Sequence, residues 1–245
     1  MIISILSAGV LTGVLSGFFG IGGGTILVPI LLFLGFTIKE AIGISVLQML
    51  MASLFGSYIN NKNRLIDLNL IIPIGIGGFI GAIGSSFFVS LVSNETLEVI
   101  FLLFLIYAFF KVVRGSKGDS GEFKQPHRAI LLLIGTLIGF FSISIGVGGS
   151  LLLVPILVGF FHYDIKKAVA TGLFFVIFSS LSGVINYSIA GTVDYFNGLV
   201  IGTASLLGVY IGIKLGHLSS EKLQKRLLLL FYGTVMVYLA IRLLS

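Results

Sequence analysis

The chain has 245 residues, of which 57% are hydrophobic and only 10% are charged. A water-soluble domain would carry about 25% charged residues. The composition therefore excludes a soluble globule, a nucleic-acid-binding domain and a disordered chain, and it predicts an all-α polytopic membrane protein. The net charge of +6 then indicates basic loops on one membrane face. With no cysteine and three histidines, we expect no metal site and no cofactor.

Apolar runs without charges predict where the chain crosses the bilayer. They cover residues 2–36, 41–59, 68–92, 97–110, 129–161, 168–190, 195–213 and 227–244. Most are close to the roughly 20 residues that a spanning helix needs. The runs 2–36 and 129–161 are too long, because as single helices each would extend about 50 Å across a hydrocarbon core about 30 Å thick. The first run also exceeds signal-peptide length, so we interpret it as a retained membrane segment.

Both long runs are interrupted near the middle by glycine. The interruptions are Gly20, Gly22, Gly23 and Gly24 in the first run and Gly146, Gly148 and Gly149, followed by Ser150, in the second. Glycine is a poor helix former and adopts positive φ angles readily. Each long run is therefore predicted to be two short helices that meet at a break.

The chain repeats itself at an offset of 126 residues. Twelve of the 23 positions in 9–31 are identical to those in 135–157, including both prolines, Pro29 and Pro155. The predicted halves are 1–113 and 128–245, joined by a polar cytoplasmic linker at 114–127. Asp67 and Asp194 are related by the repeat after one insertion, and each precedes a span as a predicted N-cap.

The distribution of basic residues favours an inverted arrangement of the halves. If each broken run crosses once, the 15 Lys and Arg residues divide 8 to 7 between the faces. If each is a hairpin that returns to its own side, they divide 2 to 13, which the positive-inside rule prefers. Each half is then a glycine-broken hairpin plus three spans, and the halves are inverted. Both termini are predicted to lie on the outer side of the cell membrane.

Broken helices in inverted repeats are typical of secondary transporters, whose substrates bind near the midplane. A helix N-terminus offers unpaired N–H groups and a partial positive charge, and glycine allows an anion to reach them. Thr25 and Ser150 follow the breaks and are expected to cap the second half-helix or donate hydroxyl groups. Pro29 and Pro155 are expected near its first turn, where proline costs little. Both breaks therefore suit a small anion.

Other readings of the same residues remain open. Glycines in membrane helices commonly allow close packing, which is our interpretation of the spaced glycines at 9–17, 77–81 and 208–216. Gln48 and Thr171 are polar residues inside spans and are candidate substrate contacts, although a helix–helix hydrogen bond explains Gln48 equally simply.

At the two breaks the sequence resembles the sulfite exporter TauE/SafE family. The residues that carry the resemblance are GFFGIGGGTILVPIL at 17–31 and IGVGGSLLLVPIL at 145–157. The resemblance implies a membrane permease with two repeated halves that moves sulfite, sulfoacetate or related organosulfonates. It points to the glycines of both breaks as substrate contacts, with Ser150 standing where the first break has Gly24.

We therefore predict a permease for a small anion that works in the lipid bilayer, with export as the expected direction. An intramembrane enzyme is the first alternative, but the three histidines lie in loops or at span ends, away from a serine at depth. A carrier of a cation or a neutral solute is the second, and it would need carboxylates or unwound carbonyls facing a pore. No Asp, Glu, Lys or Arg falls in the middle of a span.

Overall fold

The computed structural model describes residues 2–36, 38–91, 127–144, 148–191 and 193–244, with isolated positions between 96 and 113. These residues form helices and no strands, which confirms the all-α class. The helices are α1 (Ile2–Phe19), α2 (Gly24–Phe33), α3 (Ile38–Lys62), α4 (Leu68–Leu91), α6 (Arg128–Ser144), α7 (Ser150–Gly159), α8 (Ile165–Ile189), α9 (Tyr195–Leu218) and α10 (Glu221–Leu244). The predicted linker lies outside the described residues except for His127.

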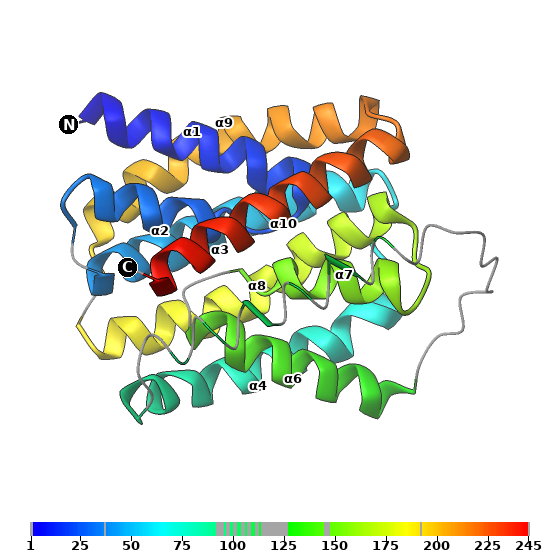
Figure 1. Ribbon diagram of the computed structural model, residues 1–245, viewed down its shortest axis with the longest axis horizontal. Helices are drawn as coiled ribbons and strands as arrows, with labels where there is room; N and C mark the ends of the chain where they lie inside the picture. The colour runs from blue at the N-terminus through cyan, green and yellow to red at the C-terminus, as the bar shows by residue number, and fades with distance from the viewer. Residues whose placement is uncertain are drawn as a thin grey trace.

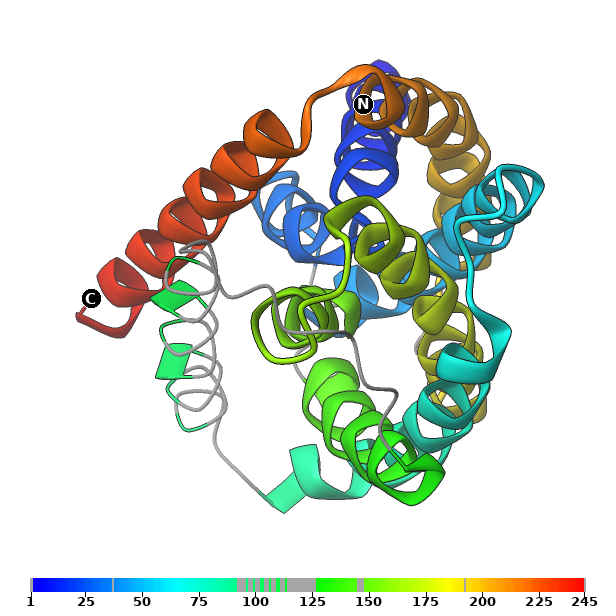
Figure 2. The ribbon, with the colours of Figure 1, turned by 90° about the vertical axis from the view of Figure 1, so that its right-hand side faces the viewer.

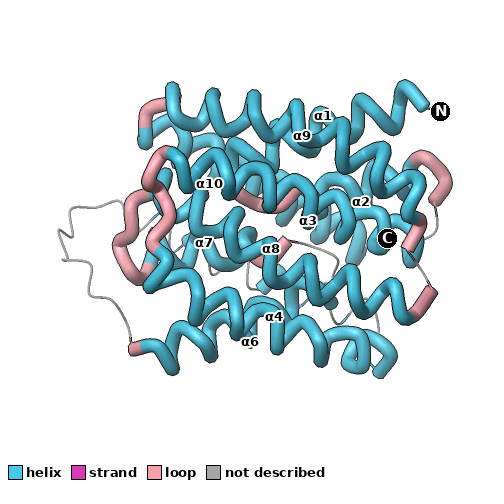
Figure 3. The backbone as a smooth tube through the Cα atoms, turned by 180° about the vertical axis from the view of Figure 1, so that it is seen from behind, coloured by secondary structure: helices cyan, strands magenta, loops and turns pink. Residues whose placement is uncertain are grey.

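The longer helices run side by side along the bundle (Figure 1). From α1 the chain turns back, so that α2 returns to the end at which α1 begins, and α7 likewise returns toward the start of α6 from the opposite end. Both termini lie at one end of the bundle in Figures 1 and 3. The short helix α7 lies inside the ring of longer helices in Figure 2, and eight of its ten residues are buried.

Three of the described helices are long and apolar enough to cross a bilayer: Glu40–Lys62 within α3, and the whole of α8 and α9. The helices α3 and α8 each have 25 residues, which gives about 37 Å at 1.5 Å per residue. By contrast, α2 and α7 each have ten residues, about 15 Å, so neither spans a bilayer alone. Large apolar side chains remain exposed on the outside of the bundle, as expected for a surface in contact with lipid.

The spaced glycines bring helix backbones from the two halves into contact. A Cβ on Gly13 of α1 would overlap the carbonyl oxygen of Ser205 in α9, and one on Gly208 would overlap that of Val10. The helices α4 and α6 meet in the same way, at Gly81 and others. The packing interpretation of these glycines is confirmed, and each half contributes its first helix to a pair with the other half.

Two aspartates begin their helices as predicted. The carboxylate of Asp67 accepts from the backbone amides of Asn69 and Leu70, at 3.0 and 3.4 Å, at the start of α4. That of Asp194 accepts from the Asn197 amide at 3.0 Å and caps α9. These caps fix where α4 and α9 enter the membrane-spanning bundle.

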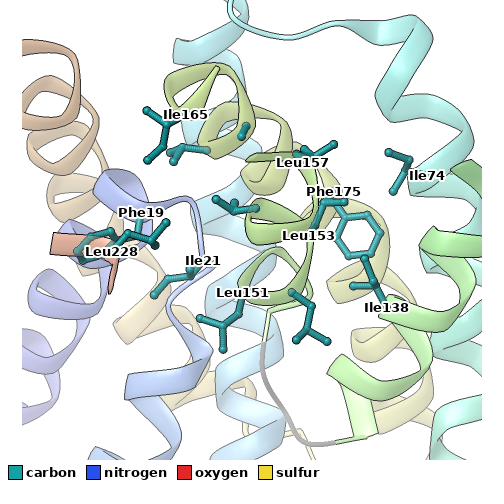
Figure 4. Packing of buried hydrophobic residues seen from close by; sticks show 14 of the residues in the cluster. Phe19, Ile21, Ile74, Ile138, Leu151, Leu153, Leu157, Ile165, Phe175 and Leu228 are labelled. Atoms are coloured by element: carbon teal, nitrogen blue, oxygen red, sulfur yellow. The ribbon is translucent and has the colours of Figure 1, made fainter. Parts of the chain in front are cut away.

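The largest buried apolar cluster surrounds the two breaks (Figure 4). Ile21 lies in the first break and Leu151 follows the second, and both are fully buried. Phe175 of α8 and Leu228 of α10 complete the packing from either side. The breaks therefore lie in the interior, where every polar atom needs a partner or carries a cost.

Candidate functional site

The first break reverses the chain through glycines in left-handed conformations. Gly20, Gly22 and Gly23 have φ angles of +72°, +75° and +82°. The amide of Gly20 donates to the Ser16 carbonyl at 2.8 Å and closes α1. Because a side chain strains such backbone, the glycines are what allows α1 to end and α2 to return along it.

The N-terminus of α2 has free donors. The amides of Ile26 and Leu27 both donate to the Gly23 carbonyl, at 3.2 and 3.1 Å. Among the described residues, no acceptor is found for the amides of Gly24 and Thr25. These N–H groups carry the partial positive charge of the helix start, in the protein interior.

Gln48 presents its side-chain amide to this helix start. A Cβ on Gly23 would lie 3.0 Å from both Nε2 and Oε1 of Gln48. The side chain is fully buried, and within the described part of the chain neither atom has a hydrogen-bond partner. The alternative reading of Gln48, a helix–helix hydrogen bond, is therefore wrong. A buried primary amide left without partners costs about 1–3 kcal/mol, unless a ligand fills the role.

The second break is built differently. Gly146 lies outside the described residues, so its place stays a prediction. At the start of α7, the amide of Leu151 donates to the Gly148 carbonyl at 3.1 Å and that of Leu152 to the Gly149 carbonyl at 3.2 Å. Gly149 occupies the N-cap position with a φ of −58° and makes no side-chain cap hydrogen bond.

Neither hydroxyl that follows a break caps its helix. Thr25 Oγ1 and Ser150 Oγ are both without a hydrogen-bond partner among the described residues. The expectation of side-chain capping is therefore wrong: Thr25 and Ser150 lie inside the first turns of α2 and α7, past the position from which a side chain caps a helix. Both hydroxyl groups remain available as donors.

An aromatic ring stands in the second half where Gln48 stands in the first. The helices α3 and α8 start 127 residues apart, which makes Phe175 the counterpart of Gln48. A Cβ on Gly149 would overlap the ring of Phe175 and lie 3.0 Å from Ser142 Oγ, which has no partner in the described part of the molecule. The N-terminus of α2, the first tip, therefore has an amide side chain beside it. The N-terminus of α7, the second tip, has an aromatic ring and hydroxyl groups beside it.

The two breaks touch at the centre of the bundle. A Cβ on Gly148 would overlap the carbonyl oxygen of Ile21. The sulfur of Met49 lies 3.5 Å from the corresponding position on Gly22 and 3.3 Å from that on Gly148. Val176, the counterpart of Met49, lies 2.9 Å from the position that a Cβ on Gly22 would take. The predicted glycines Gly22 and Gly148 are thus brought together between α3 and α8.

Gly20 and Thr171 lie at the side of this centre formed by α8. A Cβ on Gly20 would overlap the Val169 carbonyl oxygen, so the break rests on the first turns of α8. Thr171 is buried, and the next residue, Gly172, would place a Cβ 3.0 Å from that of Ser150. Burial raises the pKa of Tyr163 in the α7–α8 connection, and the side chain of Thr171 opposes that shift. Thr171 thus directly precedes the residue of α8 that approaches Ser150.

Pro29 and Pro155 are the sixth residues of α2 and α7, just past the first turn as predicted, but deep enough to cost a helical hydrogen bond. A proline there has no N–H for the carbonyl four residues earlier. For Pro155 that carbonyl belongs to Leu151, and the buried hydroxyl of Tyr232 donates to it at 3.1 Å. The sequence offered one indication of Tyr232, a tyrosine within the apolar run 227–244.

One face of α10 contacts the chain beside both breaks. Gln224 Nε2 donates to the Phe18 carbonyl at 3.2 Å, and the rings of Phe231 and Phe19 stack with centroids 5.3 Å apart. With Tyr232, these residues follow the i, i+7, i+8 spacing of a single helix face. Among the described residues, no group of three His, Cys, Asp or Glu side chains is arranged to hold a metal ion.

The sequence of this chain is similar to those of known membrane transporters. The family model described as "Sulfite exporter TauE/SafE" matches residues 5–242. The probable membrane transporter protein YunE of Bacillus subtilis (strain 168) is 26% identical over 96% of this chain and 94% of its own length. The probable membrane transporter protein MJ0441 of Methanocaldococcus jannaschii is 25% identical over 95% and 91%. No solved structure matches the chain.

The family and its relatives are transporters, in agreement with a chain that is not an enzyme. The match covers both breaks, both prolines and all the described helices apart from their outermost residues. This chain is a membrane transporter that belongs to the sulfite exporter TauE/SafE family.

Proposed function

We propose that this transporter exports small sulfur-containing anions, such as sulfite, sulfoacetate or related organosulfonates, across the cell membrane. The observation that carries the proposal is the buried amide of Gln48 beside the N–H groups of Gly24 and Thr25, all without a partner among the described residues. Donors without acceptors in a dry interior select a ligand that has several acceptor oxygens and a negative charge.

The anion is held mainly by main-chain groups. The Gly24 and Thr25 amides donate to its oxygens, and the absence of a side chain at Gly23 and Gly24 lets them approach. Gln48 Nε2 supplies a further donor, and the unpartnered hydroxyls of Thr25 and Ser150 add donors from either tip. Because Phe175 takes the place of a second amide, the oxygens face the first tip and the remainder of the ligand faces the ring.

The proposed orientation places both termini outside and the halves in inverted topology. Lys62, Arg128 and Lys166 all belong to helix ends opposite the termini, which supports a cytoplasmic position for that end. A negative-inside potential then favours outward movement of an anion by about 2.3 kcal/mol per charge per 100 mV.

Flux into proteoliposomes tests the proposal. We expect the purified protein to carry sulfite or a C2 sulfonate and not sodium or potassium, with outward flux accelerated by a negative-inside potential. Gln48→Leu should reduce anion flux at least tenfold, because it removes the donor and keeps the volume. Ser205→Ala, a buried α9 residue whose hydroxyl is satisfied by the Gly202 carbonyl, is the matched control.

Gln48→Glu separates the anion proposal from its alternatives. A carboxylate at the first tip should repel an anion and abolish its flux, whereas a carrier of a cation would keep or gain flux. Cation flux that survives or rises in this variant, with no sulfite flux in the wild type, would overturn the proposal.

A further inference from the structure

A groove separate from the breaks lies between the first turns of α4 and α6. Its volume is about 410 Å³. The walls are mostly apolar, from Leu68, Ile72 and Ile76 on α4 and Leu132 on α6, and Arg128 stands at the opening. The first residues of both helices line it, so it opens at the end of the bundle that carries the basic residues.

The walls of the groove are exposed. Leu68, Ile72, Ile76 and Leu132 keep between 40 and 48% of their surface. From position 68 to position 76 the groove follows α4 for about 12 Å at 1.5 Å per residue. In a transporter of this family such a surface faces the acyl chains of the bilayer, and a groove of this depth reaches from the interface into the hydrocarbon region.

Within the described part of the chain, the charge at the opening is unpaired. No ion pair of Arg128 is found among the described residues, and its side chain is exposed. The nearby carboxylate of Asp67 is engaged by the amides of Asn69 and Leu70 as the cap of α4. A guanidinium group free to donate at the top of an apolar groove matches a lipid phosphate above its acyl chain.

The repeat provides an internal comparison. The pair formed by α9 and α1 corresponds to the pair formed by α4 and α6, and Ile2 corresponds to Arg128 at an offset of 126. The residue related to Arg128 in the α1–α9 pair is thus apolar, and close packing of the glycines does not require a cation at this position. The positive-inside rule accounts for a cation at this end, and the groove places an apolar surface beside it.

We propose that the groove between α4 and α6 binds an anionic phospholipid of the cytoplasmic leaflet, with Arg128 on the phosphate and one acyl chain along Ile72 and Ile76. The bound lipid covers the seam between two helices that come from different halves of the chain. This inference does not depend on which substrate is transported.

Thermal unfolding of the purified full-length chain in detergent tests the site. Phosphatidylglycerol should raise the unfolding midpoint more than phosphatidylcholine, and inorganic phosphate alone should have no comparable effect. In Arg128→Gln the phosphatidylglycerol concentration that gives half of the shift should rise about fivefold, the effect of one basic residue on an anionic lipid. Lys214→Gln, which removes an exposed cation of α9 that does not line the groove, is the matched control and should respond as the wild type does.

Ala129→Trp gives a second, independent readout, because it keeps Arg128 and fills the groove. It should lose the response to phosphatidylglycerol while the response of Lys214→Gln is retained. Equal shifts with phosphatidylcholine or with inorganic phosphate would overturn the proposal, as would an unchanged response in both Arg128→Gln and Ala129→Trp.

Discussion

The hydrogen bond from Tyr232 to the Leu151 carbonyl gives a sharp prediction about the second break. Pro155 deprives this carbonyl of its helical donor, and the buried Tyr232 hydroxyl replaces it at 3.1 Å. In Tyr232→Phe the carbonyl loses this donor and stays buried. We expect the free energy of unfolding to fall by about 1–3 kcal/mol, the cost of a buried acceptor left unsatisfied.

The reasoning can be checked with a double-mutant cycle on unfolding in detergent. In a Pro155→Ala background, the new amide at position 155 can donate to Leu151, so Tyr232→Phe should then cost less than about 1 kcal/mol. Tyr210→Phe removes a hydroxyl from an exposed tyrosine of α9 and should change stability by less than about 0.5 kcal/mol. Equal costs of Tyr232→Phe in the two backgrounds, or a cost no larger than that of Tyr210→Phe, would refute the role assigned to the bond.

Three further substitutions test the breaks, the helix pairs and the caps by the same unfolding assay. Gly23→Ala should destabilise more than Gly191→Ala, since both have positive φ but only Gly23 lies against another side chain; equal losses would contradict the close approach. Gly81→Ala should lower the free energy of unfolding by several kcal/mol, because the new methyl group forces α4 away from α6. Gly233→Ala, with open space around it, should be neutral or stabilising. Similar values for the two variants would argue against close packing at Gly81. Asp164→Ala should cost about 0.5–2 kcal/mol by removing the cap on α8, and Asp164→Asn should retain most of it; a loss as large in the asparagine variant would exclude capping as the reason.

The breaks were predictable because two independent physical limits coincide there. A run of apolar residues longer than the bilayer must bend or break, and glycines mark where. The left-handed angles at Gly20, Gly22 and Gly23 follow from the same residues. The N-caps Asp67 and Asp194 were also predictable, because capping depends only on a few adjacent residues.

Contacts between distant segments were not predictable from one sequence. The close approach of the Phe175 ring to Gly149 requires α8 to be placed against α7, and the bond from Tyr232 requires α10 to cross the second break. The cost of Pro155 was misjudged, because the sixth residue of α7 already removes the helical donor of the Leu151 carbonyl. The pairing of α1 with α9 across the halves likewise depends on tertiary packing.

The central claim is that Gln48 and the N-terminus of α2 bind the anion. Equilibrium binding of radiolabelled sulfite to purified protein tests it most directly, without requiring transport. The wild type and Ser205→Ala should bind saturably with similar affinity, and Gln48→Leu should bind at least tenfold more weakly. Sulfite affinity in Gln48→Leu equal to that of the wild type would contradict the account.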